Sequence, residues 1–169
     1  RQSVWEQVTS RADEYNEPGK FTALIGYEWT SLLPYSQLGI NGSKYGHRVV
    51  IFKDSGTKAN KIIPFSRFDS QDPEDLWRFL QHYEDETGGE VLAIPHNSNL
   101  SQGSMFALND NKGRPITRAY AKVRSRWEPL VEATQVKGDS ETHPLLSPKD
   151  EFANYERYSY SSSNNEDKR

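Results

Sequence analysis

The stretch Phe21-Thr-Ala-Leu-Ile-Gly-Tyr27 decides the predicted fold, because it is a short, nearly continuous apolar run that ends at Glu28. A run of this kind predicts a strand that is buried on both faces, as in a parallel sheet. Three similar segments follow it along the chain and predict three more strands: His47-Arg-Val-Val-Ile-Phe52, Val91-Leu-Ala-Ile94 and Leu130-Val-Glu-Ala-Thr-Gln-Val136.

Helical patterns separate several of these runs. Apolar residues recur at helical spacing from Val4 to Tyr15. Asp72-Pro73-Glu74-Asp75 is a strong helix start, and Gly88-Gly89 ends that helix. Further helices are predicted from Arg118 to Trp127 and from Ser147-Pro148 onward. Helices that alternate with short apolar strands indicate βα units, so the predicted fold class is α/β with mainly parallel strands.

The segments between these elements are predicted to be irregular. Residues 32–45, 54–60 and 98–118 are rich in turn-forming residues, and Ile62 to Phe65 is predicted to be a short extended piece. Residues 159–169 form a polar tail that we expect to be disordered. A single α/β domain is therefore predicted for residues 1–158.

Composition excludes several classes of function. The chain has 169 residues, which is enough for one globular domain, and a net charge of −3 that argues against nucleic-acid binding. It has no cysteine, which excludes disulfides, thiolate zinc sites and cysteine nucleophiles. No apolar run approaches the roughly 18 residues that a membrane span needs, and there is no targeting segment. We therefore expect a soluble protein, although the sequence does not give its compartment.

Polar side chains stand at the ends of the predicted strands. Glu28 ends the first strand, His96 follows the third, and His47 lies at the edge of the second, just after a glycine. The carboxyl ends of strands are where ligands bind in barrels and open α/β sheets. Imidazole and carboxylate together suit zinc, manganese or iron. Glu28, His47 and His96 are therefore the candidate metal ligands and catalytic residues.

Ordinary structural roles compete with this interpretation. A single histidine beside a strand is more often a hydrogen-bonded structural residue than a ligand. Glu28 has the alternative role of a solvated carboxylate at a strand end, although its neighbours Tyr27 and Trp29 indicate partial burial. Moreover, the chain has no His-Glu-x-x-His signature.

The remaining histidines and acidic residues carry weaker signals. His82 is predicted to lie on the exposed side of its helix, and His143 stays ambiguous in a turn beside a proline. Asp139 and Glu141 are most simply explained as loop charges, although they follow a predicted strand. Glu132 lies within that strand, where a structural hydrogen bond is the simpler role.

Four blocks of the sequence carry a family resemblance: Pro18-Gly-Lys-Phe-Thr-Ala-Leu-Ile-Gly-Tyr-Glu-Trp-Thr30, Gly46-His-Arg-Val-Val-Ile-Phe52, Ile94-Pro-His-Asn97 with Gly103-Ser-Met-Phe106, and Gln135-Val-Lys-Gly-Asp-Ser-Glu141. From about Val4 to Tyr155, the chain resembles the family known as domain of unknown function 3604. That family is itself similar to the PHP (polymerase and histidinol phosphatase) superfamily of metal-dependent phosphoesterases.

The resemblance implies part of a distorted (β/α)7 TIM-like barrel, with two or three divalent metal ions at the carboxyl ends of its strands. Glu28 would bridge two metals, and His47 and His96 would be ligands. The implied reaction is hydrolysis of a small anionic substrate, such as a phosphoester, by a metal-activated water. Residues that we expect to hold such a substrate are Arg48, Asn97, Lys137, Asp139 and Ser140.

The sequence also departs from the PHP pattern. A His-x-His pair on the first strand and a late Asp-x-His are absent from this chain. The chain thus resembles the middle of the family's domain, and we expect it to contact the missing parts, to bind metal weakly or not at all, and to lack useful activity. Two alternatives stay open: a binding module that has lost its chemistry, and an ordinary α/β domain in which the three residues are structural.

Overall fold

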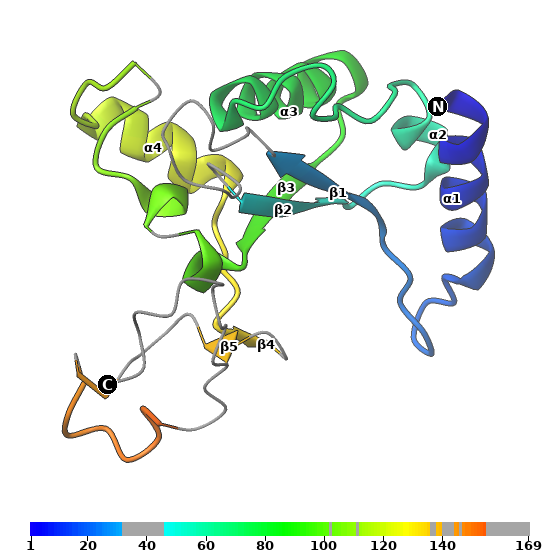
Figure 1. The fold of residues 1–169 in the computed structure, drawn as a ribbon. Helices are drawn as coiled ribbons and strands as arrows, with labels where there is room; N and C mark the ends of the chain where they lie inside the picture. The colour runs from blue at the N-terminus through cyan, green and yellow to red at the C-terminus, as the bar shows by residue number, and fades with distance from the viewer. Residues whose placement is uncertain are drawn as a thin grey trace. The chain divides into compact units, whose positions relative to one another are not determined.

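The chain divides into two compact units, residues 1–131 and residues 132–169, which are described separately. The structure is a computed structural model, shown as a ribbon in Figure 1. It describes residues 1–31, 46–101, 103–110, 112–135, 138–139, 144–145 and 147–154. The predicted loop at 32–45 and the predicted disordered tail at 159–169 lie outside these residues. None of the described helices is long and apolar enough to cross a bilayer.

A three-stranded antiparallel sheet forms the centre of the first unit. Its strands are β1 (Ile25–Ser31), β2 (Gly46–Phe52) and β3 (Val91–His96), in the order β1-β2-β3 (Figure 1). Both strand pairs are antiparallel, with Ile25 opposite Phe52 and Phe52 opposite Val91. The prediction of parallel strands in a TIM-like barrel is therefore wrong, because this sheet is open and its neighbouring strands run in opposite directions.

The apolar character of both sheet faces explains the error. Every second residue of β2 and β3 is buried, and the residues between them are half-exposed. The half-exposed face nevertheless carries Val49, Ile51, Leu92 and Ile94. An antiparallel strand with a polar outer face alternates clearly, but strands that are apolar on both faces give the continuous runs of a parallel sheet. Strand direction is therefore not encoded in these runs.

The first strand lies further along the chain than predicted. Phe21 and Leu24 belong to the predicted run, yet their side chains are exposed, and β1 begins only at Ile25. The strand continues through Glu28 to Ser31, so Glu28 lies within it rather than after its end.

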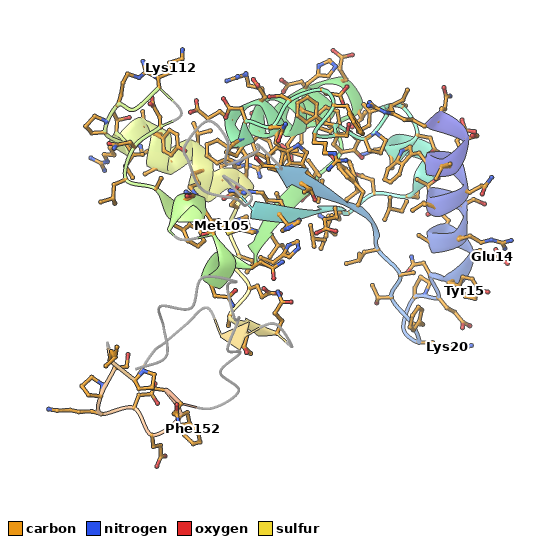
Figure 2. The ribbon with its side chains drawn as sticks, in the orientation of Figure 1. Glu14, Tyr15, Lys20, Met105, Lys112 and Phe152 are labelled. Carbon is orange, nitrogen blue, oxygen red and sulfur yellow. The ribbon has the colours of Figure 1, made fainter. Side chains whose placement is uncertain are left out.

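Three longer helices accompany the sheet. They are α1 (Gln2–Tyr15), α3 (Pro73–Thr87) and α4 (Arg118–Trp127), and each confirms a helix predicted from the sequence. Asp72 caps α3 by accepting a hydrogen bond from the Glu74 amide at 2.8 Å, and Gly88 ends the helix in the left-handed conformation. At the end of α1, Tyr15 points into solvent (Figure 2).

Shorter elements occupy the connecting segments. The predicted turn-rich stretch at 54–60 contains the one-turn helix α2 (Gly56–Ala59), and the predicted extended piece at 62–65 is not a strand. Two short 3-10 helices, η2 (Ser98–Leu100) and η3 (Ser104–Phe106), follow β3.

The hydrophobic core lies on one face of the sheet. Strand side chains on this face pack against apolar residues of the three longer helices and α2; the core includes Trp5, Ile25, Trp29, Val50, Phe52, Ala59, Leu76, Leu80, Tyr83, Ala93 and Trp127. The indole of Trp5 donates a hydrogen bond to the carbonyl of Ala59 at 3.0 Å and so joins α1 to α2. The other face of the sheet is left for the candidate site.

An ion pair is buried within this core. Arg48 Nε donates to Glu128 Oε1 at 3.0 Å, and the two side chains are only 1% and 2% exposed. The Glu128 carboxylate also accepts hydrogen bonds from the Trp77 indole at 2.9 Å and from Arg124 Nε at 3.1 Å. A single carboxylate therefore joins β2, α3 and α4. Burial lowers the pKa of Arg48 while Glu128 opposes that change, so the guanidinium stays charged.

Neutralising this carboxylate should destabilise the protein strongly. Glu128→Gln removes the carboxylate charge that faces the buried Arg48 guanidinium, and we expect the free energy of unfolding to fall by about 3–5 kcal/mol in urea denaturation. The control is Glu90→Gln, which breaks the exposed pair with Lys53 and should change stability little. Equal stability of the two variants would contradict the structural role given to Glu128.

The second unit contains a small hairpin of β4 (Thr134–Gln135) and β5 (Gly138–Asp139). Of the described residues within the predicted strand 130–136, only Thr134 and Gln135 form a strand, and Leu130 and Val131 are exposed residues before it. The helix predicted from Ser147 is also wrong within the described residues 147–154, which form turns instead.

Candidate metal centre

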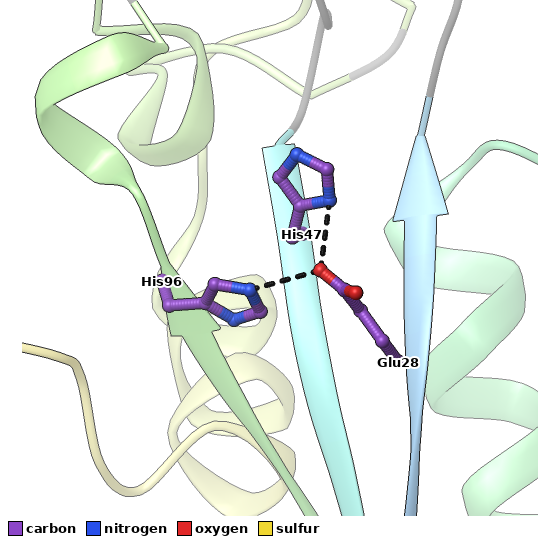
Figure 3. A group of neighbouring side chains, drawn as sticks. All are labelled: Glu28, His47 and His96. Carbon is purple, nitrogen blue, oxygen red and sulfur yellow. Dashed lines mark hydrogen bonds and ion pairs between the residues drawn. The ribbon is translucent and has the colours of Figure 1, made fainter. Parts of the chain in front are cut away.

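The geometry of the sheet places three candidate residues at one end of one face. Strands β1 and β3 run in the same direction on either side of β2, so their carboxyl ends meet the amino end of β2. His47 lies opposite both Thr30 and His96, and Glu28 precedes Thr30 by two residues on the same face. Glu28, His47 and His96 therefore converge from three strands (Figure 3).

The carboxylate of Glu28 connects the two imidazoles. Its Oε1 atom lies 3.1 Å from His47 Nδ1 and 3.1 Å from His96 Nε2 (Figure 3). The two rings stack, with centroids 5.5 Å apart. One potential ligand atom from each residue lies within 4.8 Å of the others, which is close enough for a shared metal ion.

Solvent reaches the cluster from the carboxylate side. The Glu28 side chain is 53% exposed, whereas those of His47 and His96 are 30% and 14% exposed. The histidines are therefore partly enclosed by the protein, and the carboxylate borders water. This arrangement holds the imidazoles in place and leaves the cluster accessible to a small molecule.

The second nitrogen of His96 has an acceptor of its own. Its Nδ1 atom lies 3.4 Å from the carbonyl oxygen of Ile94, while Nε2 faces Glu28. When Nδ1 carries the proton, it donates to that carbonyl and Nε2 presents its lone pair to the cluster. Metal-ligating histidines usually have such a partner for the nitrogen that does not bind the metal.

Backbone geometry at Gly46 sets the start of β2 beside His47. Gly46 has φ +68°, and a Cβ atom there would lie 2.2 Å from Cε of Met105, a side chain labelled in Figure 2. Glycine adopts this positive φ without steric cost, whereas a larger residue would be strained there and would displace the terminal methyl of Met105. The position of His47 therefore depends on a residue without a side chain immediately before it.

Gly46→Ala should cost more stability than the same change at a glycine in open space. Gly19 has φ +83°, and a Cβ atom there would meet nothing within 4 Å, so Gly19→Ala reports the backbone cost alone. We expect the Gly46→Ala variant to lose about 1–3 kcal/mol beyond that control in urea denaturation, because its methyl group overlaps Met105. The additional Met105→Ala substitution should recover part of this difference; equal costs at the two glycines would refute the close packing.

The other predicted site residues are not all brought to the cluster. Arg48 lies on the opposite face of the sheet, in the ion pair with Glu128. Asn97 follows His96 directly, is 3% exposed and has φ +63°. Asp139 belongs to β5 in the second unit, whereas Lys137 and Ser140 lie outside the described residues. The predicted substrate contacts of these residues stay predictions.

The remaining candidates behave as ordinary structural or surface residues where they are described. His82 is exposed, as predicted for that helix face. Glu132 accepts a hydrogen bond from Gln135 at 2.5 Å within the second unit. Glu141 and His143 lie outside the described residues.

Sequence reasoning missed Thr30, which contacts the cluster directly. Its hydroxyl oxygen lies 2.9 Å from His47 Nδ1. The signal was present, because a residue two positions after Glu28 shares its strand face. The predicted strand ended at Tyr27, however, so this periodicity was not applied beyond Glu28.

The donor set fits a divalent transition metal. Two imidazoles and one carboxylate are ligands that zinc, manganese and iron accept. Three protein ligands also leave a coordination position for water, as in catalytic zinc sites. Whether these residues ligate a metal stays a prediction.

Fold and site together define a small α+β unit, with helices on one face of an antiparallel sheet and a solvent-accessible cluster of one carboxylate and two imidazoles on the other. The family described as "Protein of unknown function (DUF3604)" matches residues 1–169, and the chain belongs to this family. No curated protein and no solved structure matches the chain.

Proposed function

We propose that Glu28, His47 and His96 contribute to the divalent-metal centre of a metal-dependent hydrolase that acts on phosphoesters. The observation that carries this proposal is the convergence of one carboxylate oxygen and two imidazole nitrogens from three separate strands. The choice of reaction is supported by the resemblance of this chain's family to the PHP phosphoesterases, although the PHP His-x-His and Asp-x-His motifs are absent from this chain. We propose zinc, manganese or iron as the metal, because each accepts this donor set.

A bound divalent ion would lower the pKa of a coordinated water and neutralise charge on a phosphoryl oxygen. The residues of this chain would hold the ion and fix the orientation of its ligands. Glu28 supplies the negative charge of the cluster, and His96 is aligned by the carbonyl of Ile94. The exposure of Glu28 leaves an open side through which a phosphoester approaches.

A second candidate is a non-catalytic module in which the cluster is structural. It is favoured by one observation: Glu28 Oε1 already satisfies a nitrogen of each histidine without a metal. In that case the three residues would serve as a hydrogen-bonded clasp between the strands. Metal affinity separates the two functions, because a clasp has no need to bind an ion.

Zinc titration of the 169-residue chain by isothermal calorimetry tests the metal centre. We expect a saturable site whose affinity falls about tenfold or more in Glu28→Gln and in His96→Gln, because each variant removes a ligand. His82→Gln is the matched control, since it removes an exposed histidine far from the cluster in sequence, and it should bind as the parent chain does. Absence of zinc binding by the parent chain, or equal binding by all variants, would support the clasp instead.

The reaction class has its own test in metal-dependent binding of phenylphosphonate, a non-hydrolysable phosphomonoester analogue. We expect the zinc-loaded chain to bind it and the metal-free chain not to, because the ion supplies the positive charge that holds the phosphonate oxygens. Glu28→Gln should lose this binding when it loses the metal. A zinc-loaded chain that ignores phenylphosphonate would refute the phosphoesterase assignment while leaving the metal centre intact.

A further inference from the structure

Two cross-strand rows beside the proposed metal centre carry aliphatic side chains. The first row joins Glu28, Val49 and Ile94 across β1, β2 and β3. The second row, two residues further along, places Ile51 beside Leu92. Side chains two residues apart share one face of a strand, so both rows lie on the face that carries the cluster. We call the side chains of Val49, Ile51, Leu92 and Ile94 the apolar strip.

The apolar strip is accessible to solvent and lies outside the core. Its four side chains are half-exposed. Within the described part of the chain, they belong neither to the hydrophobic core nor to the apolar side chains that pack against it. The β1 position of the second row is Gly26, opposite Ile51, so β1 contributes no side chain to that row. A contiguous apolar surface that stays in contact with water is typical of a binding site.

Polar groups lie at both ends of the strip. The cluster with Glu28 and His47 is at one end, and at about 3.4 Å per residue Ile51 lies roughly 14 Å along β2 from His47. At the other end, Lys53 and Glu90 are joined by a backbone hydrogen bond of 3.0 Å and by an exposed ion pair. Among the strand residues that the structure describes, the positions of this face between the two ends carry only aliphatic side chains or glycine.

The position of the strip indicates what it holds. When a phosphoester binds at the cluster through its phosphoryl group, its alcohol portion begins beside Glu28, and the nearest row along the sheet is that of Val49 and Ile94. These side chains offer no hydrogen bond, so a sugar placed on them would lose water without compensation. An aliphatic or aromatic alcohol would instead gain free energy by burying apolar surface against them.

We infer that the apolar strip receives the alcohol portion of the substrate, so that the centre acts on phosphoesters of aliphatic or aromatic alcohols. The inference rests on the proposed function and specifies its substrate class. It explains why a face in contact with water keeps four aliphatic side chains beside a polar cluster. The competing occupant is a second copy of the chain, which would cover the strip and exclude such an alcohol.

Calorimetric titration of the zinc-loaded 169-residue chain with alkylphosphonates tests the inference. Methylphosphonate carries little beyond the group that binds the metal, whereas hexylphosphonate adds five methylenes that extend over the strip. A methylene buried on one side gains about half of what full burial gives, so we expect hexylphosphonate to bind roughly tenfold or more tightly than methylphosphonate. Equal affinities for the two phosphonates would overturn the proposed substrate class.

A matched pair of substitutions locates the alkyl chain. Val49→Thr keeps the branched shape and replaces one methyl of the strip by a hydroxyl, so we expect the ratio of hexyl to methyl affinity to fall about two- to fourfold. Val8→Thr makes the same change at an exposed position of α1 and should keep the parent's ratio. Ile94→Thr repeats the test in β3 if Val49→Thr fails to fold. An unchanged ratio in the strip variants would place the alkyl chain elsewhere and overturn the inference.

The outcomes also separate this inference from the proposed function. If the zinc-loaded chain binds neither phosphonate, the phosphoesterase assignment fails and the substrate class fails with it. If the chain binds both phosphonates equally, only the substrate class is refuted. A dimer in analytical ultracentrifugation that Val49→Thr dissociates would assign the strip to a second copy of the chain, and would likewise refute the substrate class alone.

Discussion

The orientation of strand β2 depends on the buried ion pair between Arg48 and Glu128. Burying a guanidinium is costly unless a carboxylate and further hydrogen bonds meet it, and Glu128 provides this within the core. Side chains alternate between the two faces of a strand, so a core-facing Arg48 requires His47 to face the other side. A shift of one residue would turn His47 toward the core and Arg48 away from it, which would separate Arg48 from Glu128. The ion pair therefore specifies which face carries the cluster.

Strand direction then decides which ends of the strands meet. In a parallel sheet, His47 at the start of β2 would lie at the opposite end from His96, which ends β3. The antiparallel arrangement instead places the amino end of β2 between the carboxyl ends of its neighbours. The register sets His47 opposite both Thr30 and His96, and Glu28 reaches the pair from two residues away. Convergence of these side chains is thus a consequence of the same antiparallel pairing that excludes the predicted barrel.

The helices were predictable from the sequence because their signals are local. The Asp72 cap, Pro73 in the first turn and Gly88 at the end fix α3 within a few neighbouring residues. Strand direction has no such local signal, since apolar residues on both faces of β2 and β3 fit either pairing. The start of β1 was missed for a related reason: Phe21 and Leu24 are apolar but exposed, and exposure is settled by packing rather than by residue type.

The candidate site, like the fold, was predictable from the sequence only in part. Glu28, His47 and His96 stand out as polar groups beside apolar runs, and the structure brings them together, although through antiparallel strands rather than the carboxyl ends of parallel ones. Thr30 was not found, because the predicted strand ended at Tyr27 and its alternation was not continued beyond Glu28 to residue 30. Arg48 was misleading because the alternation of side chains was not applied to the second strand either. A cation next to a candidate ligand in the sequence suggests an anion site. Side chains alternate between the two faces of a strand, however, so Arg48 points into the core while His47 points to the other face.

X-ray absorption at the zinc edge is the sharpest test of the metal centre, because it reports the atoms around the ion itself. For the zinc-loaded chain, we predict a first shell of nitrogen and oxygen at about 2.0–2.2 Å, together with outer-shell scattering from two imidazole rings. A spectrum without imidazole scattering, or one that is unchanged when His47 and His96 are both replaced by glutamine, would show that zinc binds elsewhere and would contradict the assignment of this cluster as a metal centre.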